Sequence, residues 1–305
     1  MAAKILMVGS IMMDLILQMA RVPDPSESVL GDSYKNAGGG KGSNSAVAAS
    51  RVGADVAVYC TLGQDANGEA LKAMLEAEGM DTDYMQLVEG QSTGMAVILL
   101  EESGMNRIII YKGANDATAP DALAGAFAKA PQAVMMQLEI PLETNIAALE
   151  MAREKGIITC LDAGPAQDYP LEKMKGLTIL SPNETETKAL VGILPVDEDT
   201  CLEASRKLME RAHCQYVVLK MGDKGSYIYG EGIQEMVPPY TVDCVDPTAA
   251  GDAFTGALVK MYVETGDILA AAKYANAVGG LACTKLGAQP SLPTAEEVDA
   301  FLSKQ

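Results

Sequence analysis

Short apolar runs alternate with longer stretches of helical periodicity along most of the chain. This alternation is typical of parallel β-strands joined by helical crossovers. The predicted strands are Lys4–Gly9, Asp55–Tyr59, Ala133–Gln137, Ile157–Leu161, Leu177–Leu180 and Tyr216–Lys220. The predicted helices are Ser45–Val52, Gly68–Glu78, Leu142–Lys155, Thr200–Arg211, Gly251–Thr265, Ile268–Leu286 and Glu296–Ser303. The pattern therefore predicts an α/β protein built on a largely parallel sheet.

Two stretches lack the alternation and are predicted to be extended strands without intervening helices. In the second of them, Met95–Leu100 and Arg107–Tyr111 flank the turn-like segment Glu102–Asn106. Strands inserted into an α/β frame often form a small separate sheet over an active site. We therefore expect two parts of the chain: a core of residues 1–14, 39–92 and 113–305, and a β lid of residues 15–38 and 93–112.

The balance of charge is strongly acidic, with 23 Lys plus Arg against 41 Asp plus Glu and a net charge of −18. Such a surface repels nucleic-acid phosphates and anionic membranes, so neither is an expected partner. No apolar run approaches membrane-spanning length. A phosphate site in this chain must therefore be made positive by backbone amides, a helix N-terminus, a metal ion or a few placed cations.

The cysteines are scattered, and the single histidine, His213, has no partner histidine. A zinc site is therefore not expected. Buried, reduced thiols in a cytoplasmic protein are the preferred interpretation. The chain enters its first strand almost at once, without a basic region followed by an apolar signal segment. The six cysteines are Cys60, Cys160, Cys201, Cys214, Cys244 and Cys283.

The strongest chemical signal is the segment from Asp246 to Ala257, which is rich in small residues and leads into an apolar helix. Small residues let the backbone approach a ligand, and the amides of a helix's first turn can bind an anion. A carboxylate at that turn, Asp252, suits a proton acceptor beside a phosphate. On this segment alone, an ordinary helix cap is an equally good interpretation of Asp252.

Two further segments are ambiguous by themselves. Gly38–Ala46 contains Gly-Gly-Gly-Lys-Gly-Ser-Asn but fails the Walker pattern, because Lys41 is followed by Gly. Alone it reads better as a flexible loop in which Ser43 or Asn44 caps the next helix. Asp14 follows the first strand at the edge where open α/β sheets bind ligands, although a lone Asp there is usually turn chemistry.

Together these segments resemble the ribokinase-like carbohydrate kinases in order and spacing across nearly the whole chain. The matching motifs are Gly9-Ser10 to Asp14, Gly39–Asn44, Gln137–Glu139, Pro182–Glu186, Ala249–Asp252 and Gly287–Ser291. The resemblance implies a ribokinase-like three-layer α/β/α fold with a mainly parallel central sheet and a small β-sheet lid. It also implies transfer of the ATP γ-phosphoryl group to the 5-hydroxyl of a pentose.

The resemblance assigns roles to individual residues. Asp252 would be the base, with Gly251, Ala250 and Ala249 as the anion hole for the transferred phosphoryl group. The residues that would hold the sugar are Met12, Asp14, Gly40, Lys41, Asn44 and Glu139. The residues that would bind ATP are Asn183, Lys220, Met221, Gly222, Asp223, Lys224, Gly225, Gly251 and Asn276. Glu186 would act on Mg²⁺ through a metal-bound water.

The resemblance further implies an activating monovalent cation, K⁺, beside the anion hole. The residues in the corresponding positions, several acting through backbone carbonyls, are Asp246, Thr248, Ala282, Lys285, Gly287 and Ser291. An ordinary helix-start loop is the alternative for this segment. Lids in the family commonly pair between subunits, so the resemblance also implies a homodimer formed through the lid.

Two departures from the family bear on specificity. Ribokinases usually carry Asn where this chain has Met12, and Met cannot serve a buried hydroxyl as donor and acceptor. The Met matches the deoxyribokinase branch and favours 2-deoxy-D-ribose over D-ribose, unless Met12 points into the core beside Met13. Lys220 replaces a small polar residue and either contacts phosphate or is exposed. The alternative functions are a D-ribose kinase, a nucleoside kinase and a non-catalytic sugar-binding regulator.

Overall fold

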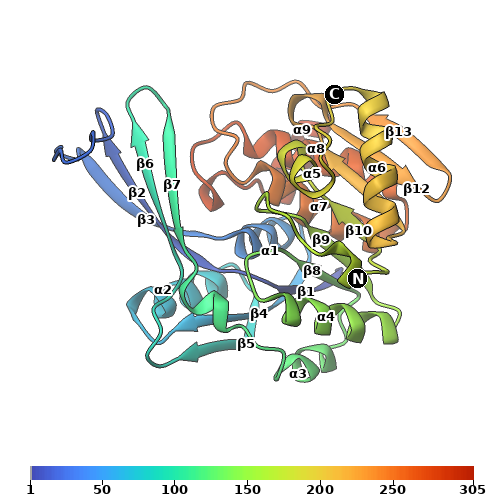
Figure 1. The fold of residues 1–305 in the computed structure, drawn as a ribbon, viewed down its shortest axis with the longest axis horizontal. Helices are drawn as coiled ribbons and strands as arrows, with labels where there is room; N and C mark the ends of the chain where they lie inside the picture. The colour runs from blue at the N-terminus through green and yellow to red at the C-terminus, as the bar shows by residue number, and fades with distance from the viewer. Residues whose placement is uncertain (1) are drawn as a thin grey trace.

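A computed structural model describes residues 2–305, and within this range the largest sheet has nine strands in the order β13-β12-β11-β10-β9-β8-β1-β4-β5 (Figure 1). Neighbouring strands from β11 to β5 run parallel, and β12 and β13 are antiparallel additions at one edge. The strands are β1 (Lys4–Val8), β4 (Asp55–Gly63), β5 (Asp81–Val88), β8 (Ala133–Met136), β9 (Ile158–Asp162), β10 (Ile179–Ser181), β11 (Tyr216–Lys220), β12 (Ser226–Gly230) and β13 (Ile233–Val237). The predicted fold class is confirmed.

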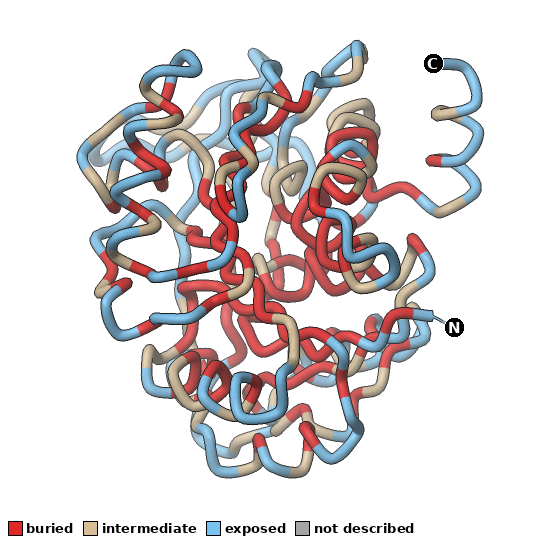
Figure 2. Tube along the Cα trace, turned by 90° about the vertical axis from the view of Figure 1, so that its right-hand side faces the viewer, coloured by how far each residue is buried: buried red, intermediate tan, exposed pale blue. Residues whose placement is uncertain are grey.

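Helices cover both faces of this sheet, which makes the architecture three-layered. An apolar cluster lies on each face of the sheet. Along β1 the side chains alternate between them: Ile5 and Met7 pack into one cluster, and Leu6 and Val8 pack into the other. Figure 2 shows the buried chain running through the middle of the molecule. The helices are α1 (Lys41–Arg51), α2 (Ala66–Ala77), α3 (Leu123–Ala128), α4 (Leu142–Glu154), α5 (Glu184–Val191), α6 (Glu198–Ala212), α7 (Ala250–Thr265), α8 (Ile268–Ala282) and α9 (Ala295–Leu302). Among residues 2–305, none of them combines the length and the apolar character needed to cross a membrane.

A second, four-stranded sheet stands apart from the large one, in the order β3-β2-β6-β7 (Figure 1). Only the β2–β6 pair is parallel. Its strands are β2 (Met12–Met19), β3 (Ser33–Gly39), β6 (Met95–Glu101) and β7 (Asn106–Tyr111). All four come from the two stretches predicted to be extended or from residues next to them. The division of the chain into a core and a lid at the predicted boundaries stays a prediction.

Helix α1 begins at Lys41, four residues before the predicted start. Gly40 makes this possible, because it precedes the helix with φ of 90°, which glycine adopts without strain. A Cβ on Gly40 would also lie 3.0 Å from the Met12 backbone nitrogen. The predicted start was wrong because the Lys-Gly-Ser-Asn sequence has weak intrinsic helix propensity. Here the tertiary packing of the turn outweighs that propensity.

Helices α1 and α7 cross in close contact at Gly256. A Cβ on Gly256 would lie 2.4 Å from the Ser45 carbonyl oxygen, so only glycine permits this approach. The first turns of both helices are thereby brought together at the carboxyl edge of the sheet. Helix α8 follows α7 and ends at Ala282 rather than at the predicted Leu286.

Candidate active site

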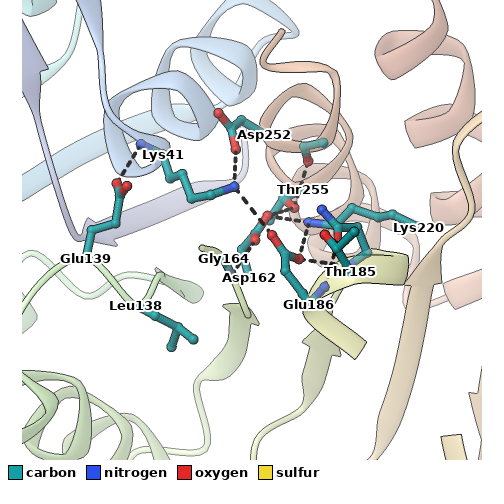
Figure 3. A network of polar contacts seen from close by, with 12 residues as sticks. Lys41, Leu138, Glu139, Asp162, Gly164, Thr185, Glu186, Lys220, Asp252 and Thr255 are labelled. Atoms are coloured by element: carbon teal, nitrogen blue, oxygen red, sulfur yellow. Dashed lines mark hydrogen bonds and ion pairs between the residues drawn. The ribbon is translucent and has the colours of Figure 1, made fainter. Parts of the chain in front are cut away.

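Polar side chains gather where adjacent parallel strands end, and Figure 3 shows them converging from several elements. The carboxyl ends of parallel strands meet at one edge of the sheet, which is where open α/β folds bind ligands. The first turns of α1 and α7 face the same edge. The residues contributed by the strand ends are Ser10 after β1, Glu139 after β8, Asp162 on β9, Asn183 and Glu186 after β10, and Lys220 on β11.

Asp252 lies in the first turn of α7 but does not cap it. The capping position is Ala249, which has φ of 60°. The Asp252 carboxylate instead accepts a hydrogen bond of 2.8 Å from the Asn44 amide and lies 3.5 Å from the Lys41 ammonium. The interpretation of Asp252 as an ordinary cap is therefore wrong. The same holds for Ser43 and Asn44, since α1 begins without a side-chain cap.

Lys41 links several of the predicted site residues. Its ammonium lies 3.5 Å from Asp252 and 3.6 Å from Glu186, and its backbone N–H donates to Glu139 over 3.1 Å. Burial disfavours the charged ammonium, but the surrounding carboxylates, Asp252 foremost, outweigh it and hold the pKa of Lys41 well above its usual value. Lys41 is therefore a fixed positive charge between the two carboxylates.

A second lysine lies deeper in the same network. Lys220 donates a 2.6 Å hydrogen bond to Asp162, which also accepts from the Thr255 hydroxyl over 2.8 Å. The Lys220 ammonium is 4.0 Å from Glu186. Burial acts to raise the pKa of Asp162, but Lys220 and then Lys41 outweigh it, so the pKa is lowered. The expectation that Lys220 could be exposed is wrong.

Asp162 was not predicted from the sequence. It is fully buried, and the sequence signal was available: like Asp14, it is an acidic residue at the carboxyl end of an apolar strand. Such a position is ambiguous in sequence because most of these residues serve turns. The buried partner, Lys220, lies 58 residues away in the chain, so only the fold reveals the pair.

Asp14, on strand β2 of the four-stranded sheet, and Glu139, which follows β8, lie in the same part of the site. The Asp14 carboxyl group lies against Gly39 of the neighbouring strand, where an added Cβ would be only 2.2 Å away. Burial, followed by the charges of Glu139 and Asp252, raises the pKa of Asp14 to about 7. Burial also raises the pKa of Glu139, which accepts hydrogen bonds from the Ser10 hydroxyl and the Lys41 amide. Three carboxyl groups therefore share one region.

Met12 is buried on the Asp14 face of strand β2. Successive residues of a strand point to opposite faces, so Met12 and Asp14 share one face and Met13 lies on the other. Met13 belongs to the core cluster under α1 and α7, whereas Met12 belongs to neither core cluster of residues 2–305. The side chain of Met12 is therefore not a core neighbour of Met13.

A cavity of about 520 Å³ adjoins this network on the side of α7 and α8. The predicted residues that line it are Asn183, Lys220, Gly222, Asp223, Gly225, Ala250, Gly251 and Asn276. Its apolar wall, which the sequence did not suggest, includes Pro239, Tyr240 and Val242. An apolar wall at one end and a helix N-terminus at the other suit a ligand with a flat base and an anionic tail.

Three predicted residues of this region are placed differently. The Met221 side chain packs in the core beneath α6, and the Lys224 ammonium donates to the Val196 carbonyl oxygen over 2.7 Å. Neither lines the cavity. The Ala250 N–H donates to the Pro247 carbonyl oxygen over 3.1 Å, so it is engaged in the turn rather than offered to an anion.

The predicted cation segment joins two loops through one carboxylate. Asp246 accepts hydrogen bonds from the Thr248 N–H over 3.0 Å and from the Gly287 N–H over 2.8 Å. Burial acts to raise the pKa of Asp246, but the hydrogen bonds from Thr248 and Gly287 outweigh it, so the pKa is lowered. Ala282 ends α8 nearby, and the Ser291 hydroxyl donates to the Ala288 carbonyl oxygen. The Lys285 side chain is paired with Glu297 over 2.6 Å instead.

Comparison with known proteins gives the family. The model of the pfkB family carbohydrate kinases matches residues 2–295. The ribokinase of Haemophilus influenzae is 33% identical over 296 residues, covering 96% of either chain. The deoxyribokinase of Salmonella typhimurium is 33% identical over 303 residues, covering 98% of either chain.

Two further similarities agree. The bifunctional ribokinase/ribose-5-phosphate isomerase A of Fructilactobacillus sanfranciscensis is 36% identical over 300 residues, and the chain spans only 55% of that protein's length. The structure of Arabidopsis thaliana ribokinase complexed with ribose and ATP has a TM-score of 0.89 and 31% identity over 99% of either chain. The chain therefore belongs to the pfkB family of carbohydrate kinases.

Proposed function

We propose that this kinase transfers the γ-phosphoryl group of ATP to the 5-hydroxyl of a pentose, with 2-deoxy-D-ribose preferred to D-ribose. One observation carries the proposal. Gly251 lines the cavity, and the next residue, Asp252, projects into the carboxylate network with Asn44 and Lys41. The first turn of α7 thus separates an anion-accepting cavity from a cluster of groups suited to sugar hydroxyls.

The chemistry follows from this arrangement. Asp252 accepts the proton of the attacking hydroxyl, and Asn44 and Lys41 fix the direction of its carboxylate. The Gly251 amide and the dipole of α7 stabilise charge on the transferred group. Lys220 also lies close to this turn, since a Cβ on Gly251 would be 3.7 Å from its ammonium. Lys220 therefore adds positive charge on the cavity side.

Asp14 and Glu139 complete the proposed sugar site with Gly40 and the backbone of Lys41. Buried hydroxyls need both donors and acceptors, and these groups supply them. Met12, on the Asp14 face of β2, supplies apolar volume instead. A ribose hydroxyl facing Met12 would lose a partner, at a cost of about 1–3 kcal/mol. A sugar without that hydroxyl loses nothing, which supports the deoxy sugar.

Mg²⁺ and K⁺ are part of the proposal. Glu186 offers the hard oxygen donors that Mg²⁺ prefers. Among residues 2–305, no three His, Cys, Asp or Glu side chains gather as a metal site. Mg²⁺ would accordingly be held by Glu186 through water together with the phosphates, whose charge it neutralises. The oxygens of Asp246, Thr248 and Ser291, with backbone carbonyls of Ala282, Lys285 and Gly287, suit K⁺.

ADP release tests the proposal, measured with Mg²⁺ and K⁺ and with 2-deoxy-D-ribose or D-ribose as acceptor. Wild type should prefer the deoxy sugar, and Met12→Asn should shift the preference toward D-ribose by roughly tenfold or more. Met105→Asn, at an exposed methionine of the lid hairpin, is the matched control and should leave the preference unchanged.

Asp252→Asn tests the assignment of the base. Turnover should fall by a factor on the order of 10²–10⁴ while ATP still binds. Persistent turnover in this variant would contradict the assignment.

Equal preference of wild type and Met12→Asn for D-ribose would contradict the role of Met12. Turnover with nucleosides alone would favour a nucleoside kinase, and sugar binding without any turnover a non-catalytic regulator.

A further inference from the structure

Two of the six cysteines lie together in the wall of the cavity that we assign to the nucleotide. Cys244 is exposed and Cys283 is partly exposed, and both line the cavity. Cys244 belongs to the loop that carries the apolar wall, and Cys283 directly follows the last residue of α8. The remaining thiols, Cys60, Cys160, Cys201 and Cys214, are buried in the two cores.

The backbones of the two segments are hydrogen bonded at this point. The N–H groups of Val245 and Asp246 both donate to the Cys283 carbonyl oxygen, over 2.7 Å and 3.0 Å. Cys244 therefore immediately precedes a residue, Val245, whose backbone is hydrogen bonded to Cys283. These hydrogen bonds hold the two segments side by side, as a disulfide between residues 244 and 283 would require.

The two thiols differ in their accessibility. Cys244 is exposed to solvent, whereas Cys283 is only partly exposed. The exposed Cys244 is consequently the thiol that an external reagent meets first, with Cys283 beside it as the second.

We propose that Cys244 and Cys283 form a redox modification site for low-molecular-weight disulfides, and that bound nucleotide and modification exclude one another. The second half of this inference rests on the proposed assignment of the cavity to the nucleotide. The first half rests only on the position of the two thiols. In this interpretation, oxidation of the pair ties the cavity loop to the end of α8.

The chemistry balances with a disulfide such as oxidised glutathione as the oxidant. The Cys244 thiolate attacks one sulfur of the reagent, a protein–glutathione disulfide forms, and one glutathione thiol leaves. Cys283 then loses its proton, attacks the Cys244 sulfur and displaces the second glutathione thiol. Two protein thiols become one disulfide while one oxidised glutathione becomes two reduced molecules. The intermediate places a tripeptide in the cavity, where it competes for space with a nucleotide.

The test uses full-length protein treated with oxidised glutathione and followed by intact mass and peptide mapping. Wild type should lose the mass of two hydrogen atoms, with a mapped link between residues 244 and 283 that a reducing agent reverses. Cys283→Ser and Cys283→Ala should both stop at the glutathione adduct. Cys244→Ser should react at least about tenfold more slowly, because the remaining cavity thiol, Cys283, is less accessible to the reagent. Cys214→Ser, which removes a buried thiol elsewhere, is the matched control and should behave as wild type.

ADP is the second arm of the experiment. At ten times its dissociation constant, ADP leaves roughly a tenth of the protein unbound, so the reaction should slow about tenfold. A link between other cysteines, or unchanged reactivity in Cys244→Ser, would overturn the proposal. A 244–283 link that forms equally fast with ADP would overturn the mutual exclusion and leave the dithiol site standing. That result would count against the nucleotide assignment of the cavity, whatever the kinase activity shows.

Discussion

Lys220 and Asp162 form a 2.6 Å ion pair whose side chains are 8% and 0% exposed, directly beneath the first turn of α7. The two charges of a buried ion pair attract each other strongly. Removing either partner is destabilising, because it leaves the other charge buried and unpaired. Thr255 of α7 donates to the same carboxylate. The pair therefore connects the floor of the cavity to the helix that carries Asp252.

Lys220→Met is expected to destabilise the protein by about 3–5 kcal/mol, because it leaves Asp162 charged and buried. Asp162→Asn should destabilise it as well, and the double variant should lose less than the two single losses combined. Urea unfolding of the four proteins measures this coupling. Lys72→Met, at an exposed pair with Glu76, should change stability by less than about 1 kcal/mol. Additive losses would show that the pair is not energetically coupled.

Stability should depend on pH through Asp14, whose pKa burial and neighbouring carboxylates raise to about 7. Between about pH 4 and 7 the folded protein holds a proton on Asp14 that the unfolded chain has released. The stability from this group is thus full below about pH 4 and is lost as the pH rises through 7. This loss amounts to up to about 4 kcal/mol of unfolding free energy in wild type, and Asp14→Asn should not show it because Asn does not titrate.

Urea unfolding at pH 5 and pH 8 compares the two proteins. The stability of Asp14→Asn relative to wild type should be greater at pH 8 than at pH 5. Asp32→Asn, at an exposed carboxylate just before strand β3, is the control and should leave the pH dependence as in wild type. A pH dependence unchanged by Asp14→Asn would show that Asp14 is ionised throughout this range.

Gly256→Ala should separate α1 from α7, since the added methyl would lie 2.4 Å from the Ser45 carbonyl oxygen. We expect a loss of about 1–3 kcal/mol in stability and a fall in turnover, because Asn44 and Asp252 move apart. Gly280→Ala in α8 is the matched control for stability, with no atom closer than 3.7 Å to its methyl. That variant should be neutral or up to about 1 kcal/mol more stable, owing to the better helix propensity of Ala. Equal effects of the two changes would mean that the helix crossing does not need Gly256.

The lid is expected to pair two copies of the chain. Every residue of the edge strand β7 is exposed, including Ile108, Ile109 and Ile110, and Ile109 is 62% exposed. Open, apolar edges of this kind are normally covered. Sedimentation equilibrium should give a dimer for wild type and a monomer for Ile109→Lys. Leu194→Lys, at an exposed leucine outside the lid, should stay dimeric, and a monomeric wild type would refute the expectation.

Six strands of the large sheet were predictable because each contains a short, mostly apolar run, and Tyr216–Lys220 was predicted with its observed bounds. Strand β5 escaped prediction because Asp81–Val88 mixes polar with apolar residues at the sheet edge. The carboxylate network was only partly predictable. Asp252 and Lys41 stand in recognisable motifs, whereas the role of Asp162 depends on its ion pair with Lys220, which lies on another strand. The apolar cavity wall around Tyr240 and Val242 follows from no periodic pattern.

Asn44 and Asp252, which share a 2.8 Å hydrogen bond, are separated by 208 residues of chain. During synthesis, strands β1 to β11 emerge before α7 does, so the sheet can begin to form while its carboxyl edge still lacks the α7 turn. Contacts of this sequence separation are among the last to form, because closing so long a loop costs entropy. A truncated or stalled product that ends before α7 would therefore expose Asp14, Lys41, Glu139 and Asp162 without the helix that covers them. Such a product is a candidate for quality control by chaperones and proteases, since its unmatched charges and uncovered apolar face have no partner.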